Sequence, residues 1–185
     1  MKKIETPLTW GLAIILMISL FFGNLTTNND SNIISGDINS NDKISDISDI
    51  FDKNCKTVIE YEKAFCNEDI DYEKFYSDKA IIKGTTLGSK DSMNVADRKV
   101  AHQEMWQKYD FSMSQPLNQL PGVNPETKKM DGSVRMYFDI TITLTENGKS
   151  ITIPMYNSFD FDDEGKIIFL QYYGDFTSAF LSLDE

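Results

Sequence analysis

The sequence predicts an α+β domain in which N-terminal helices pack in a curved antiparallel sheet, preceded by a hydrophobic anchor helix and a disordered tether. From residue 52 onward, apolar residues recur first at helical spacing and later at every second position. Two hairpin turns, at residues 146–149 and 163–166, join the last three predicted strands. Helices followed by hairpin-linked strands are typical of the α+β class.

Residues 1–23 have the composition of a membrane anchor or a signal segment. Two lysines precede an uncharged apolar run, residues 8–23, and this charge pattern favours a cytoplasmic N-terminus with the rest of the chain outside a bacterial membrane. A leader peptidase prefers a small residue where bulky Phe21 lies, so we expect a retained anchor. The alternative is cleavage near Gly23, which gives a periplasmic or secreted protein.

Residues 24–51 are rich in Asn, Ser and Asp, and this composition predicts a flexible acidic linker. The domain itself is expected at residues 52–185. The formal net charge of −11 and the absence of a basic stripe argue against nucleic acid as a partner.

The predicted first helix carries both cysteines, Cys55 and Cys66. Eleven residues of helix separate them by about 16 Å, which excludes a disulfide within one continuous helix. With a single histidine in the chain and no paired cysteine spacing, neither a metal site nor another cofactor is expected.

The helices and the first strand follow from apolar periodicity and capping residues. Periodic apolar positions predict a helix over residues 56–67, a short helix over 69–76 and a strand over 80–83. A longer helix is predicted over 91–109, with Asp91 or Ser92 as its cap.

The remaining elements are predicted as sheet and one closing helix. Strands are expected at residues 111–117, 134–145, 151–161 and 167–173, with a loop at 119–131 that contains Pro and Gly and a terminal helix at 176–183.

Two segments resemble the nuclear transport factor 2-like, or SnoaL-like, superfamily. Residues 64–71, Ala-Phe-Cys-Asn-Glu-Asp-Ile-Asp, are similar to the family's helix end, although Glu68 stands where the family usually has glycine. Residues 163–173, with Asp175 beyond them, are similar to its closing strand. The resemblance covers residues 52–183 and implies a cone-shaped fold with a cavity and frequent homodimers through the sheet. It also implies activities that range from ketosteroid isomerase, scytalone dehydratase and polyketide cyclase to non-catalytic modules.

Three residues are candidates for acid–base chemistry. Glu62 projects between apolar residues of the first helix, and His102 lies on the apolar face of the long helix, with Arg98 at the edge of that face. A buried carboxyl or imidazole group near neutrality suits proton transfer. The alternatives are that Glu62 reaches water at the rim of its stripe, that His102 is a core residue bonded to a backbone carbonyl, and that Asp175 only caps the terminal helix.

Five residues are expected to bind a ligand because they place polar or aromatic groups on the predicted inner face. Trp106 and Tyr109 share the inner side of the long helix, Asn157 interrupts an apolar strand face, and Gln171 and Tyr173 continue the face begun by Ile167.

Two functions remain open. The first is a membrane-tethered, envelope-exposed module that binds a small apolar ligand or a protein partner. The second is a small isomerase, dehydratase or cyclase that uses Glu62, His102 or Asp175 on an apolar substrate. The enzyme requires its acid and base within about 3 Å of a common substrate site.

Overall fold

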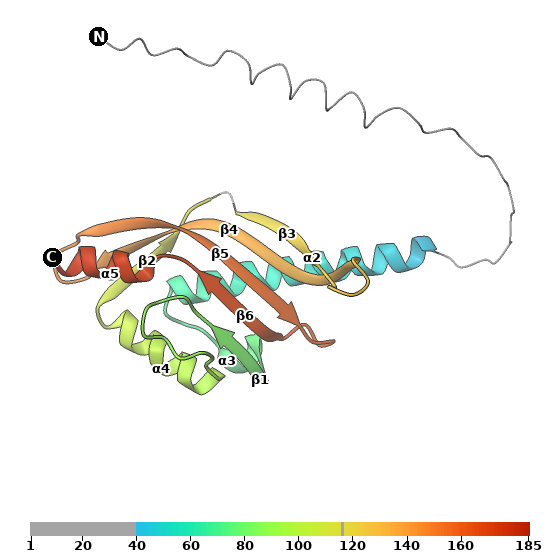
Figure 1. Ribbon diagram of the computed structural model, residues 1–185, viewed down its shortest axis with the longest axis horizontal. Helices are drawn as coiled ribbons and strands as arrows, with labels where there is room; N and C mark the ends of the chain where they lie inside the picture. Colours follow the sequence, from blue (N-terminus) through green and yellow to red (C-terminus); the bar gives the residue numbers. More distant parts are fainter. Residues whose placement is uncertain (1–39, 116) are drawn as a thin grey trace, which may run out of the picture. The chain divides into compact units, whose positions relative to one another are not determined.

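Six strands form one sheet in the computed structural model, which describes residues 40–115 and 117–185 (Figure 1). The strands are β1 (Tyr76–Lys83), β2 (Tyr109–Met113), β3 (Asn118–Val123), β4 (Met130–Leu144), β5 (Ser150–Phe161) and β6 (Ile167–Tyr173). Their order is β1-β6-β5-β4-β2, and β3 pairs with β4. All pairings are antiparallel except that of β1 with β6. The predicted α+β class is confirmed.

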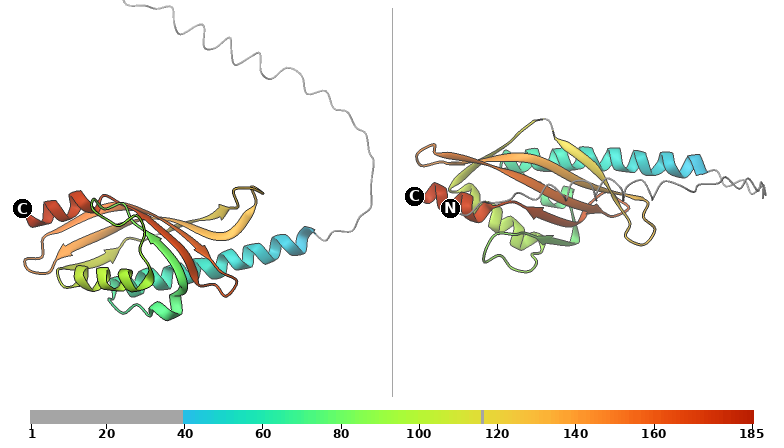
Figure 2. Two further views of the ribbon diagram at one scale, coloured as in Figure 1. Left: turned by 60° about the horizontal axis from the view of Figure 1, so that its bottom comes forward. Right: turned by 45° about the horizontal axis from the view of Figure 1, so that its top comes forward.

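Four helices accompany the sheet: α2 (Ser40–Cys66), α3 (Tyr72–Phe75), α4 (Val95–Trp106) and α5 (Phe176–Asp184). Helices α2 and α4 lie on the same side of the curved sheet (Figure 2). Helix α2 packs on β4 and β2, α4 packs on β1, and α5 packs on β5. The core therefore lies between the helices and the concave face of the sheet.

Helix α2 begins at Ser40, so the last twelve residues of the predicted linker are helical. The apolar stripe of Val58 continues backward through Phe51 and Ile47 at helical spacing. Buried Asn54 also fixes this segment by donating to Gly132 O (2.9 Å). Cys55 and Cys66 are both free.

The predicted anchor, residues 1–23, and the linker up to residue 39 lie outside the described residues. Within residues 40–115 and 117–185, no helix is both long enough and apolar enough to cross a membrane.

The predicted long helix is too long at both ends. Helix α4 starts after Asn94, whose side chain accepts a hydrogen bond from Asp97 N (2.8 Å), so Asn94 is the N-cap instead of Asp91 or Ser92. It ends at Trp106, and Tyr109 already belongs to β2, where it pairs with Leu144. Pairing with the sheet therefore overrides the helical periodicity at Tyr109.

Much of the predicted loop at 119–131 is strand. Residues of β3 pair with the first half of β4 despite Pro121 and Gly122. Proline is tolerated there because β3 is an edge strand with pairing on one side only. Asn124 closes the following turn by accepting from Glu126 N and Thr127 N, both at 2.9 Å.

An irregularity in register reverses the predicted inner face of β6. Its pairing shifts between Asp160 and Phe161, and Leu170 and Tyr172 are buried in place of Phe169 and Gln171. Simple alternation from Ile167 fails because a bulge inserts one residue and exchanges the two faces.

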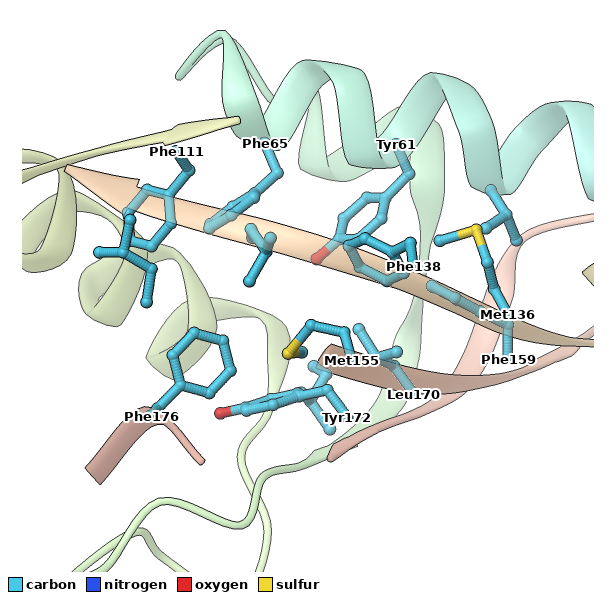
Figure 3. Packing of buried hydrophobic residues seen from close by; sticks show 14 of the residues in the cluster. Tyr61, Phe65, Phe111, Met136, Phe138, Met155, Phe159, Leu170, Tyr172 and Phe176 are labelled. Carbon is cyan, nitrogen blue, oxygen red and sulfur yellow. The ribbon is translucent and has the colours of Figure 1, made fainter. Parts of the chain in front are cut away.

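The interior is filled by aromatic and aliphatic side chains from both layers. Figure 3 shows Tyr61 and Phe65 of α2 facing Met155, Tyr172 and Phe176 across this interior. Side chains from both groups line the inner cavity that is described below.

Candidate functional site

A small inner cavity of about 50 Å³ lies between α2, α4, α5 and the strands β4, β5 and β6. Most of its lining is apolar, and its polar side chains converge from α2, α4, β5, β6 and the loop after β1. The lining residues are Tyr61, Glu62, Phe65, Thr86, Arg98, Met105, Phe138, Ile140, Met155, Asn157, Leu170, Tyr172, Phe176 and Phe180. An apolar hollow with a few convergent polar groups is the usual form of a ligand site.

Glu62 is the acidic residue of this cavity. It is 4% exposed, and Asn157 Nδ2 donates to its Oε1 (2.7 Å). Burial raises the pKa of the Glu62 carboxyl to about 7, while the hydrogen bond from Asn157 and the charge of Arg98 oppose this rise. Among the described residues no hydrogen bond to Oε2 is present, so this oxygen is free to meet a ligand.

Arg98 supplies a cation to the same cavity from α4. It is 8% exposed, and its Cζ atom lies 4.4 Å from the centroid of the Tyr172 ring. Burial lowers the pKa of Arg98, but the neighbouring tyrosine phenols outweigh this effect and raise it overall, so the guanidinium stays charged. Tyr172 can lie against the loop after β1 because residue 84 is glycine, and a Cβ there would collide with its hydroxyl group.

Tyr61 adds a hydroxyl group whose orientation is set by a neighbour. Tyr76 Oη donates to Tyr61 Oη (2.8 Å), and both side chains are buried. Burial raises the pKa of both phenols, so each stays protonated. Because Tyr61 accepts from Tyr76, its own proton is available to a ligand in the cavity.

A larger hollow of about 730 Å³, which is open to the surface and which we call the outer chamber, adjoins the inner cavity. The two share Thr86, Arg98, Met105, Tyr172 and Phe180 as lining residues. The outer chamber is bounded by the loop after β1, by α4 and by Phe180 of α5. A ligand larger than the inner cavity can therefore extend outward past Arg98.

His102 is fully buried but does not line the inner cavity. Its Nδ1 atom lies 2.7 Å from Tyr72 Oη, and its ring packs against Phe65 and Trp106 at centroid distances of 4.9 and 5.2 Å. Burial, together with the charge of Arg98, lowers the pKa of His102 to about 2. The structure thus places His102 in an aromatic cluster, bonded to a tyrosine and not to a backbone carbonyl.

Two predicted ligand-binding residues lie beside the cavity without lining it. Trp106 is half-buried in the His102 cluster. Tyr109 is buried at the start of β2, where its ring stacks on Phe180 and its hydroxyl donates to Asp184 (3.2 Å), and it lines only the outer chamber.

Three further predicted residues lie outside the inner cavity. Gln171 and Tyr173 point away from it because of the register irregularity in β6, and Tyr173 packs on Tyr156 of the outer face. Asp175 is exposed and caps α5 by accepting from Ser178 N (3.1 Å). Asn157, in contrast, lies in the cavity, as strand alternation predicts.

The structure thus assembles Glu62 and Asn157 with three residues that were not predicted to form a site: Arg98, Tyr61 and Tyr172. Arg98 lies four residues before His102, so both share one face of α4. This spacing is the feature of the sequence that could have predicted the burial of Arg98. Tyr172 could not be found from alternation, because the irregularity in β6 reverses its face.

The cavity offers a proton carrier, a hydroxyl donor and a cation around one small apolar space. This set suits proton transfer on a substrate whose oxygen gains negative charge. Within the described part of the chain, no group of three His, Cys, Asp or Glu residues is placed to hold a metal ion.

No protein-family model matches the sequence, and no curated protein matches it significantly. Solved structures do match the fold. A proposed isomerase from Bacillus subtilis is 14% identical, with a TM-score of 0.59 over 71% of this chain and 94% of that one. A proposed polyketide cyclase from Xanthomonas campestris is 17% identical, with a TM-score of 0.54 over 70% and 95%.

A third similar structure is a nuclear transport factor 2-like protein from Burkholderia xenovorans. It is 11% identical, with a TM-score of 0.55 over 72% of this chain and 97% of that one. At these identities the likeness concerns the fold and not the activity. The described domain has the cone-shaped α+β fold of the nuclear transport factor 2-like, or SnoaL-like, superfamily.

Proposed function

We propose that the domain is an acid–base catalyst of the small isomerase, dehydratase or cyclase type, with Glu62 as its proton carrier. The observation that carries this proposal is a buried carboxyl that opens on an apolar cavity and has a pKa of about 7. Such a group exchanges protons readily near neutral pH and is a stronger base than an ordinary carboxylate.

The chemistry follows from the groups around the cavity. The Glu62 carboxylate takes a proton from a carbon next to a substrate carbonyl, and the electron pair moves onto the carbonyl oxygen. Tyr61 donates a hydrogen bond to that oxygen and stabilises its charge. When the substrate has a carbon–carbon double bond next to the deprotonated carbon, return of the proton from Glu62 to the far end of that bond moves the double bond, completes an isomerisation and restores the carboxylate.

The similar structures described as an isomerase and a polyketide cyclase support a proposal of this class, although they assign no role to any residue here. A second candidate is a module that binds a small molecule without converting it. The observation that favours it is the inner cavity's volume of about 50 Å³, because ligand sites usually measure several hundred Å³.

Deuterium exchange separates the two candidates without knowledge of the natural substrate. The full chain is incubated with small ketones such as cyclohexanone in deuterium oxide, and loss of the α-proton signal is followed by NMR. We expect protein-dependent exchange that falls about 100- to 10,000-fold in Glu62→Gln. Bound ketone without exchange, or equal exchange in Glu62→Gln, would support the binding module.

The envelope location is proposed from the N-terminal sequence alone. The uncharged apolar run at residues 8–23, preceded by two lysines, supports a single-pass anchor with the domain outside the cytoplasm. Digestion of intact cells by an added protease tests this location. Removal of the domain is expected, and full protection would contradict an outward orientation.

A further inference from the structure

The chain has two arginines, Arg98 and Arg135, and their surroundings differ in one decisive respect. Arg135 Nη1 pairs with Asp160 Oδ1 at 3.0 Å and also donates to Phe159 O at 3.1 Å. Arg98 is more deeply buried, yet it forms no ion pair with any residue that the structure describes, and its Nε atom has no hydrogen-bond partner.

The other cations around the two chambers are already neutralised. Lys90 lies 3.3 Å from Asp97, and Lys108 lies 2.6 Å from Asp184. Glu62, the acidic residue that lines the inner cavity, binds Asn157 and forms no ion pair with Arg98. Arg98 is therefore the one cation lining either chamber without an acidic partner among the described residues.

A buried charge without a counterion is strongly unfavourable, and the face of the Tyr172 ring compensates it only in part. A protein retains such a group where a ligand completes its surroundings. The natural complement is an anion that accepts the Nε hydrogen and a second hydrogen of the planar guanidinium fork.

We infer that Arg98 binds the carboxylate of an organic acid, so that the substrate class of this cavity is small carboxylates with an apolar body. The inference rests on the proposed function in that it places the ligand in the same cavity as Glu62. A carboxylate suits this site better than a phosphate because a single guanidinium faces a small space of about 50 Å³.

The outer chamber provides room for the apolar body. Arg98 lines both chambers, so a carboxylate held there leaves the rest of the molecule free to extend outward. The exposed side chains Leu87 and Val100, 85% and 54% accessible, offer apolar contact in that direction.

Calorimetric titration of the full chain with hexanoate tests the inference, with hexan-1-ol as a neutral probe of the same chain length. Wild type is expected to bind hexanoate about tenfold or more tightly than hexanol. Arg98→Met should lose this preference, and Arg135→Met, the matched arginine variant, should keep it. Equal binding of the two probes by wild type, or an unchanged preference in Arg98→Met, would overturn the inference.

Thermal unfolding without ligand supplies a second readout. Removal of an uncompensated buried charge should leave the melting temperature of Arg98→Met equal to or above that of wild type, whereas Arg135→Met should melt lower. A lower melting temperature for Arg98→Met would show that Arg98 serves the fold instead. Arg98→Lys, which keeps the charge, should bind hexanoate more weakly than wild type and still prefer it to hexanol.

Glu62→Gln distinguishes failure of this inference from failure of the proposed function. The variant should bind hexanoate at least as well as wild type, because it removes a nearby acid, and it should lose deuterium exchange. Glu62-dependent exchange on neutral ketones without hexanoate binding would refute the carboxylate inference alone. Arg98-dependent hexanoate binding with exchange unaffected in Glu62→Gln would refute the catalytic proposal alone.

Discussion

Glu62 and His102 are both buried titratable side chains, but their surroundings differ. His102 is fully buried, binds Tyr72 and is enclosed by the rings of Phe65 and Trp106. Glu62 is 4% exposed, binds Asn157 and opens on the inner cavity. Burial alone is common to both, so it cannot mark the site.

Access to a cavity therefore decides which of these two buried groups can react with a ligand. Burial lowers the pKa of His102 to about 2 and raises that of Glu62 to about 7. Desolvation thus keeps His102 neutral near pH 7, whereas it leaves Glu62 about half ionised there. Only Glu62 combines this shift with a free oxygen, a neighbouring cation and space for a ligand.

The largest difference between the two regions is expected when the Tyr61 hydroxyl group is removed, with removal of the Tyr72 hydroxyl group as the matched control. Tyr61→Phe should lower deuterium exchange by about 100- to 1,000-fold, because the donor to the developing oxyanion is lost. Tyr72→Phe removes a hydroxyl from the His102 cluster and should leave the exchange rate close to wild type. Comparable losses in the two variants, measured by the same NMR assay, would show that the Tyr61 hydroxyl group has no special role in the exchange.

The two buried groups should affect stability in opposite pH ranges. The folded-state pKa of Glu62 is raised from 4.5 to about 7, so its contribution is present below pH 4.5 and is lost as pH rises through 7. Urea unfolding should show that wild type loses about 3 kcal/mol relative to Glu62→Gln between these values.

For His102 the contribution to stability changes with pH in the opposite direction. Its folded-state pKa is depressed from 6.5 to about 2, so its contribution is present above pH 6.5 and is lost as pH falls towards 2. His102→Gln should therefore lose less stability on acidification than wild type. An identical acid dependence of the two unfolding free energies would show that His102 is protonated in the folded state.

A smaller loss of stability is expected when the His102 hydrogen bond is removed at neutral pH. His102→Leu leaves Tyr72 Oη without its partner and should lower the free energy of unfolding by about 1–3 kcal/mol. The deuterium exchange rate should stay near that of wild type. A loss of exchange without a loss of stability would assign a catalytic role to His102.

The smallest effect is expected at Asp175, which the sequence also suggested as a proton carrier. Asp175→Ala removes the cap on Ser178 N and should slightly lower the melting temperature. Because Asp175 lies outside the inner cavity, the exchange rate should not change. Reduced exchange at an unaltered melting temperature would indicate that Asp175 transfers protons.

The sequence predicted the fold class and most of the sheet because strand alternation and hairpin turns are local signals. Strands β4 and β5 are examples, and their hairpin turn contains the predicted Asn147-Gly148 pair. The start of α2 was missed because its Asn, Ser and Asp residues mask the apolar stripe that packs on the sheet.

The candidate site was less accessible to sequence reasoning. Glu62 and Asn157 were found because each interrupts an apolar pattern. Arg98 was placed only at the edge of a helix face, since one sequence does not show whether a neighbouring element covers that edge. Gln171 and Tyr173 were assigned to the wrong face, because the irregularity in β6 depends on pairing with other strands.

The pKa of Glu62 decides whether this residue can act as the proton carrier of the inner cavity, and it can be measured directly. The side-chain carboxyl carbon can be followed by ¹³C NMR across pH, with Glu62→Gln to assign its signal. We expect a midpoint near 7, which moves upward when hexanoate binds because a second negative charge disfavours ionisation. A midpoint near the ordinary value of 4.5, unmoved by hexanoate, would contradict this expectation.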